Sequence, residues 1–134
     1  MNDQTNTAAP EFNIAAFEAR DTAWLDVQNI KDDGPLLHNG QPVRIEIRSP
    51  GTKEAMNAQH KAEVSNNAKT FAALRGKVTK DTVDTGIAAR AERLEAVTAQ
   101  IENFPITAKA LYTNPKLGWI TAQAEKFAND WANF

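Results

Sequence analysis

Histidines are the residues of this 134-residue chain that could most directly bind a metal or act as an acid or base. There are only two: His38 lies among turn residues, and His60 lies inside a stretch with helical spacing. A zinc site needs more ligands at fixed spacings, and the sequence has neither an H-x-x-x-H pair nor a cysteine. We therefore interpret both histidines as ordinary surface or half-buried side chains and expect no metal or cofactor.

Serines and paired carboxylates give no stronger case for an active site. Neither Ser49, in a turn, nor Ser65, among asparagines, occupies the G-x-S-x-G motif of a serine hydrolase. A solvated loop explains the Asp32-Asp33 pair, and a helix start explains Asp81 with Asp84. Calcium loops and glycine-rich phosphate cradles are missing from the sequence as well. The sequence thus predicts a protein that is not an enzyme.

The balance of charges argues against two classes of binding protein. Fifteen basic and seventeen acidic residues leave a net charge of −2, whereas nucleic-acid coats and polybasic membrane binders need a strong positive excess. No stretch approaches the roughly 20 apolar residues of a membrane span. The first ten residues also lack the basic-then-apolar pattern of a signal peptide. We expect a protein of the cytoplasm without a membrane partner.

One locally basic stretch, between residues 53 and 80, could favour nucleic acid. Steps of eight residues turn about 80° around a helix, so its side chains do not form one stripe. We interpret them as the solvated side of a helix, and a small nucleic-acid-binding regulator remains the weaker alternative. The basic residues are Lys53, Lys61, Lys69, Arg75, Lys77 and Lys80, accompanied by Glu54 and Glu63.

The N-terminal third predicts the strands that would frame the domain. Residues 22–29 and 43–48 each alternate apolar and polar side chains with the period of a half-buried strand. Turn clusters separate the two segments, so we expect an antiparallel hairpin spanning about 22–48. Because two strands alone are barely stable, helices must cover their apolar face. The apolar positions are Ala23, Leu25, Val27, Val43, Ile45 and Ile47.

Helical spacing follows the strands. The predicted fold class is α+β, mainly helical: an N-terminal β-hairpin followed by three or four α-helices. Thr52, Asp81 and Thr107 are the expected N-caps. The predicted helices span about 52–75, 82–103, 107–113 and 117–133, within a single domain 13–134 that follows a flexible tail, 1–12. In the first helix we expect one apolar face, formed by Met56, Val64, Ala68, Phe71 and Leu74.

Bulky apolar side chains gather at the C-terminus. A stripe with helical spacing runs through Leu117, Ile120, Ala124, Phe127, Trp131 and Phe134. Trp119 is expected to point away from this stripe, so the last helix would offer apolar surface on two sides. Packing within the domain and completion by a partner are both open interpretations. The candidate partner-binding residues are Leu111, Tyr112, Trp119, Ile120, Phe127, Trp131 and Phe134.

Several runs share an order with a known family. Residues 32–52 contain D-D-G-P-L and N-G-Q-P-V-R-I-E-I-R-S-P-G-T, and a long alanine-rich stretch follows. Residues 108–134 read A-K-A-L-Y-T-N-P-K-L-G-W-I-x-x-Q-A-x-x-F-x-x-D-x-A-N-F. Together these runs resemble the small tail assembly chaperones of long-tailed bacteriophages. Residues 101–106 depart from the family pattern, because many relatives have a tryptophan-containing segment there.

The resemblance implies a non-enzymatic assembly factor in the cytoplasm of the infected bacterial host, absent from the mature virion. The implied partners are the tail tape measure protein, which such chaperones keep soluble, and the tail tube protein that polymerises around it. The alternative is a structural virion protein of the head–tail joining or tail-completion type. Apart from the resemblance, apolar helix faces that two strands cannot cover predict self-association.

Overall fold

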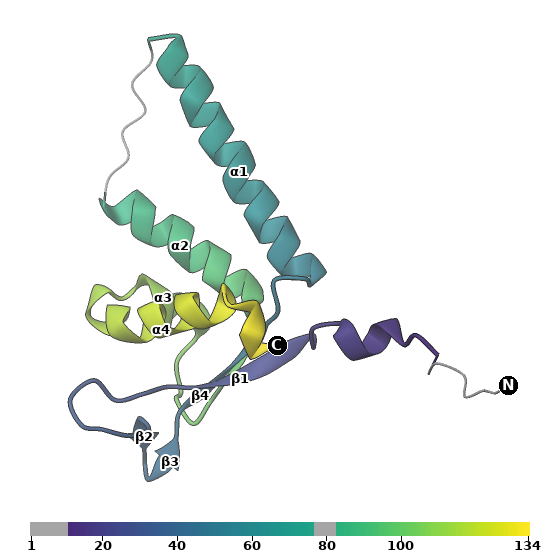
Figure 1. Ribbon diagram of the computed structural model, residues 1–134. Coiled ribbons are helices and arrows are strands. Elements are labelled where there is room, and N and C mark those ends of the chain that lie inside the picture. The colour runs from purple at the N-terminus through teal and green to yellow at the C-terminus, as the bar shows by residue number, and fades with distance from the viewer. Residues whose placement is uncertain (1–10, 77–82) are drawn as a thin grey trace, which may run out of the picture.

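A three-stranded antiparallel sheet and four α-helices make up residues 11–76 and 83–134, which the computed structural model describes (Figure 1). The mixed, mainly helical α+β class is confirmed. The expected Asp81 cap and most of the expected tail lie outside the described residues. The elements are η1 (Ile14–Phe17), β1 (Thr22–Asp26), β2 (Leu37–His38), β3 (Gln41–Pro42), β4 (Arg44–Arg48), α1 (Lys53–Leu74), α2 (Val83–Val97), β5 (Thr98–Glu102), α3 (Ala108–Thr113), η2 (Pro115–Leu117), α4 (Gly118–Ala128) and η3 (Trp131–Asn133).

The sheet places β4 in the centre, between β1 and β5. β1 and β4 pair antiparallel, with Thr22 opposite Arg48 and Asp26 opposite Arg44. The two alternating segments therefore do pair with each other. A simple N-terminal hairpin is not clearly shown, because the connection folds into its own small sheet, β2–β3, and a third strand joins the other edge of β4.

That third strand corrects the predicted helix over 82–103. α2 ends at Val97, and the chain continues as β5, with Ile101 opposite Ile45 of β4. Two interactions favour the change. The edge of β4 gains backbone partners, and the Arg48 guanidinium donates to the main-chain oxygens of Ala96 and Thr98, both at 3.1 Å, where α2 ends.

The core lies between the sheet and helices α2, α3 and α4. The buried strand residues meet the apolar faces of these helices in one cluster. Its members are Val27, Val43, Ile45, Ile47, Ala91, Leu94, Val97, Leu111, Tyr112, Ile120, Ala124 and Ala128. α1 contributes no buried residue. The body, by which we mean the sheet with α2, α3 and α4, thus closes its core without the longest described helix.

The C-terminal stripe does not form one continuous helix. α4 ends at Ala128, and the Asp130 side chain accepts a hydrogen bond from the Ala132 amide at 3.0 Å to begin η3. The Asn133 amide group donates back to the main-chain oxygen of Phe127 at 3.0 Å. The predicted helix over 117–133 is therefore wrong in its last turns. An aspartate whose side chain accepts from the backbone amide two residues later favours the start of a new helix over the continuation of the preceding one.

Arg20 joins the two ends of the described chain. Its backbone amide donates to the main-chain oxygen of Phe134 at 2.9 Å, and its guanidinium reaches the oxygens of Phe134 and Asn133. The main-chain oxygen of Asp21 accepts from the Ser49 amide at 2.8 Å. Residues 11–19, here called the N-terminal arm, extend from this anchor away from the body (Figure 1).

Candidate partner-binding surface

One side of α1 packs against α2 through small side chains. The helix begins at a Thr52 cap, as predicted, whose hydroxyl accepts from the Ala55 amide at 3.3 Å. Half-buried residues then recur every three or four positions, except where Ser65 and Asn66 line the space between the helices. This inward seam consists of Ala55, Ala58, Ala62, Lys69 and Ala72. Alanine lets two helices approach closely but buries little apolar surface.

The bulky apolar residues of α1 lie on its opposite side. At 100° per residue, Met56, Val64, Phe71 and Leu74 fall within an arc of about 80°, and the inward seam lies roughly opposite. Their exposed fractions are 55%, 52%, 63% and 79%. We call these four residues the outward face. The expected apolar face of this helix is therefore turned towards solvent, and Ala68, its fifth expected member, is exposed too.

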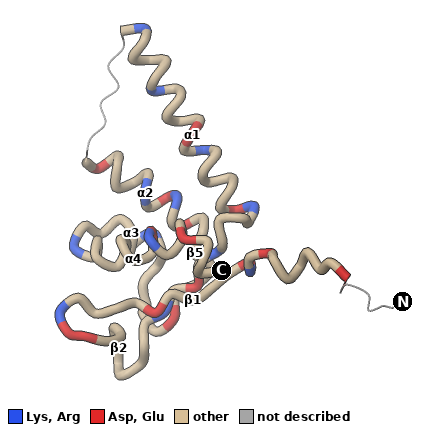
Figure 2. Tube along the Cα trace, viewed as in Figure 1, with Lys and Arg blue, Asp and Glu red and all other residues tan. Residues whose placement is uncertain are grey.

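Ion pairs link α1 to α2 and α2 to α4. Lys61 of α1 pairs with Glu92 of α2, and Arg93 of α2 pairs with Glu125 of α4 at 2.7 Å. Basic positions are spread along α1 rather than gathered at one place (Figure 2). Within the described part of the basic stretch, Glu92 therefore offsets the charge of Lys61.

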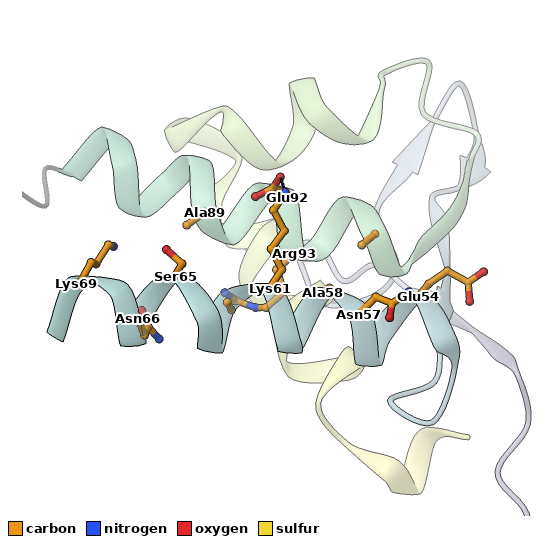
Figure 3. Close-up of a pocket in the computed structure, with 12 residues that line it drawn as sticks. Glu54, Asn57, Ala58, Lys61, Ser65, Asn66, Lys69, Ala89, Glu92 and Arg93 are labelled. Atoms are coloured by element: carbon orange, nitrogen blue, oxygen red, sulfur yellow. Dashed lines mark hydrogen bonds and ion pairs between the residues drawn. The ribbon is translucent and has the colours of Figure 1, made fainter. Parts of the chain in front are cut away.

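A cleft of about 560 Å³ separates α1 from α2, with side chains of both helices along it (Figure 3). Its carboxylates are Glu54 and Glu92, and Glu92 is bound to Lys61. Within the described residues, no group of three or more potential metal-ligating side chains occurs. The cleft is lined by Glu54, Asn57, Ala58, Lys61, Ala62, Ser65, Asn66, Lys69, Ala89, Glu92, Arg93 and Ala96.

Three of the seven candidate partner-binding residues are core. Leu111, Tyr112 and Ile120 are 0%, 2% and 1% exposed. The Tyr112 hydroxyl shares a 2.7 Å hydrogen bond with Thr98. Burial raises the pKa of Tyr112 above 10.0, with the bond to Thr98 opposing the rise and the Glu95 carboxylate adding to it. These three side chains offer a partner no surface in this structure, because α3 and α4 direct them into the core.

The other four candidates range from half-buried to exposed. Trp119, Phe127 and Phe134 pack partly buried against the core, and the rings of Phe127 and Phe134 meet edge-on at 5.5 Å. The expectation that Trp119 points away from the packed side is therefore wrong. Trp131 is 59% exposed, yet its ring lies so close to Gly51 that a Cβ there would approach within 3.2 Å.

The residues considered first for chemistry are also scattered. The His38 ring lies edge-on to Phe104, whereas His60 is exposed on α1. Ser49 is buried in the turn before α1, and Asp84 lies in the first turn of α2. None of these residues is brought beside another in a catalytic pattern. Among the described helices, none is long and apolar enough to cross a membrane.

The N-terminal arm is the second exposed apolar surface. Phe12, Ile14 and Phe17 are 78%, 65% and 78% exposed, and the two phenylalanine rings stack at 5.7 Å. Our sequence interpretation missed this surface, because it treated residues 1–12 as a tail and found only one helical turn nearby. The signal available was three apolar side chains within six residues, bracketed by Glu11 and Glu18.

Comparisons with known proteins do not assign the chain to a family. No family model matches it, and neither curated proteins nor solved structures yield a significant match.

Proposed function

We propose that the protein is a tail assembly chaperone of a long-tailed bacteriophage. In this role it binds the tape measure protein, keeps it soluble in the cytoplasm of the infected bacterium and helps recruit tail tube subunits. It is then absent from the mature virion. The proposal rests on the resemblance of residues 32–52 and 108–134 to that family, and on the surface of α1.

The observation that carries the proposal is the outward face of α1. Met56, Val64, Phe71 and Leu74 present bulky apolar surface along one side of a helix whose other side is held by α2. An apolar helix face of this kind can pack against an amphipathic helix of a partner, with anchors repeating at helical spacing. A tape measure protein, as a long helical client, would supply such segments.

The residues of the family-like C-terminal pattern make hydrogen bonds within the chain. Gln123 donates to the main-chain oxygen of Gln28 at 2.9 Å and accepts from its amide at 2.8 Å, which attaches α4 to the chain just after β1. Asn133 and Phe134 bind Phe127 and Arg20. These residues hold the body together, so we place client binding on α1 and not on the C-terminal helix.

Co-expression with the tape measure protein tests this assignment. We expect the wild-type chain to keep that protein in the soluble fraction and the V64S/F71S variant to lose most of this effect. A matched control, Q59S/A73S, changes two exposed α1 residues outside the outward face and should behave as the wild type does. A V64S/F71S variant that solubilises the client fully would contradict the assignment.

The N-terminal arm favours one alternative function. Subunits that remain in a virion bury exposed apolar segments against their neighbours, and Phe12, Ile14 and Phe17 form such a segment. A head–tail joining or tail-completion protein would therefore fit this feature. Mass spectrometry of purified particles separates the two functions: the chaperone should be missing from them, and a stoichiometric presence would overturn our proposal.

A further inference from the structure

We infer that the N-terminal arm of one copy docks on the outward face of α1 in a second copy. Both surfaces are apolar and exposed in the single chain, and neither is needed to close its core. The inference does not need the proposed function, because it depends only on these two surfaces. Since both use the outward face, the arm of a second copy and a client would compete for α1.

The charges at the two surfaces are complementary. Glu11 and Glu18 bracket the apolar residues of the arm, whereas Lys53 and Arg75 bracket the outward face, whose one nearby carboxylate is Glu63 beside Val64. None of the four bracketing side chains forms an ion pair among the described residues. An arm laid along α1 would bring carboxylates towards free cations while its apolar side chains meet those of the helix. This complementarity favours an acidic apolar segment as the occupant, and the chain itself supplies one.

The arm cannot reach the far half of its own outward face. The Asp21–Ser49 hydrogen bond holds the base of the arm beside the start of α1. Phe71 and Leu74 lie about 27 and 32 Å further along the helix, at 1.5 Å per residue. With its turn of 3₁₀ helix retained, the arm from Asp21 to Phe12 spans at most about 25 Å. The backbone of the described arm thus falls short of Phe71 and Leu74 in its own chain, and we infer that the arm of a second copy covers that half.

Reciprocal docking would bury enough surface for a stable pair. Aromatic side chains bury about 150 Å² or more each. Two arms with three apolar side chains each, seated on two helices, bury on the order of 1,000–1,500 Å² in total, which reaches the range of specific interfaces. A single arm would fall below it. We therefore expect a two-fold dimer in which each copy gives its arm to the other.

Disulfide trapping tests the docking directly, because the chain has no cysteine of its own. A tagged A16C chain, with its cysteine between Ile14 and Phe17, is mixed with an untagged N67C chain, with its cysteine between Val64 and Phe71. We expect the mixed disulfide to form at least tenfold faster than with the control N66C, one residue away but 100° around the helix. Equal rates would overturn the inference. So would an intrachain disulfide in the double variant A16C/N67C that is independent of protein concentration.

Sedimentation velocity provides the second test. The wild type should form a dimer of 14.7 kDa chains, and F12S/F17S should raise its dissociation constant at least tenfold. At concentrations where both proteins are monomeric, their melting temperatures should be equal. A wild type that stays monomeric at tens of micromolar, or a variant that dimerises as well, would overturn the inference. Because F12S/F17S leaves α1 intact, it should still solubilise a client, so failure of the docking and failure of the proposed function are distinguishable.

Discussion

The body and α1 use apolar residues at similar spacing for opposite purposes. In the body, Ile45 and Ile120 are at most 1% exposed, and every helix presses its apolar face onto the sheet or onto another helix. In α1 the bulky side chains point to solvent, and alanines make the intramolecular contact. The difference shows that apolar spacing identifies a helix face but not what covers it. In this chain the bulky side chains of α1 stay exposed, and we propose that another molecule covers them.

Removing a core side chain of the body should have the largest effect. Ile120→Ala leaves a cavity beneath α4 and should lower the free energy of unfolding by about 3 kcal/mol. Val64→Ala removes a similar side chain from α1 and should change it by less than about 0.5 kcal/mol. Urea unfolding of both variants measures the contrast. Equal losses at a concentration where the protein is monomeric would mean that the outward face of α1 is buried within its own chain.

Truncating a half-buried aromatic residue of α4 should lower the free energy of unfolding by an amount between these two. Trp119 and Phe127 pack against the core without being fully enclosed. Either alanine variant should lose about 2 kcal/mol, below the 3–5 kcal/mol of a fully buried aromatic side chain. Thermal and urea unfolding compare the two. If Trp119→Ala leaves stability unchanged but abolishes client binding, the C-terminal helix is the binding element and our assignment to α1 is wrong.

Within the body, replacing Tyr112 should cause a smaller loss of stability, and that loss should depend on pH. Tyr112→Phe removes the hydroxyl bond to Thr98 and should cost about 1 kcal/mol at neutral pH. Because burial raises the pKa of Tyr112 in the folded state, the neutral phenol stabilises the fold fully below the unfolded value of about 10. That contribution is lost as pH rises from about 10 through the folded pKa.

Urea unfolding of both proteins between pH 8 and 11 measures this contribution. The wild type should lose stability more steeply than Tyr112→Phe above pH 10, and parallel curves would argue against a buried phenol. The comparison cancels every effect of pH that the two proteins share.

The smallest effect on folding is expected on the outward face. Phe71→Ser removes exposed apolar surface and should leave the melting temperature within about 1 °C, because a surface change away from packed contacts costs little. Association should nevertheless weaken. Calorimetry and sedimentation of the same sample check the two expectations, and a drop of several degrees would place Phe71 in an intramolecular contact.

The sequence predicts the elements that have a clear period and a clear end. The alternation around Ile45 gives β4, and the Thr52 and Thr107 caps give the starts of α1 and α3. β5 is missed because Thr98 and Ile101 continue the spacing of the preceding helix. Only the open edge of β4, a tertiary feature, turns that segment into a strand.

The candidate surface is less predictable than the fold. Aromatic density pointed to the C-terminus, where Tyr112 and Ile120 proved to be core. The inward seam of α1 gives no strong apolar signal, since alanine is neither bulky nor polar, so the sequence does not predict that this side of the helix meets α2. Which of the two sides of α1 meets the body depends on the packing surface of α2. The local sequence pattern of α1 carries no information about that surface.

Hydrogen exchange measured on the chain alone and with the tape measure protein tests most directly whether α1 is the binding element. Our account predicts that amides of residues 64–74 exchange at least tenfold more slowly in the complex, whereas amides of β4 and α4 change little. Fast exchange of residues 64–74 in the free chain would still agree with this account, because α1 has no fully buried residue and touches the core only through Ala55 near its start. Protection confined to α4, with α1 unchanged, would contradict it.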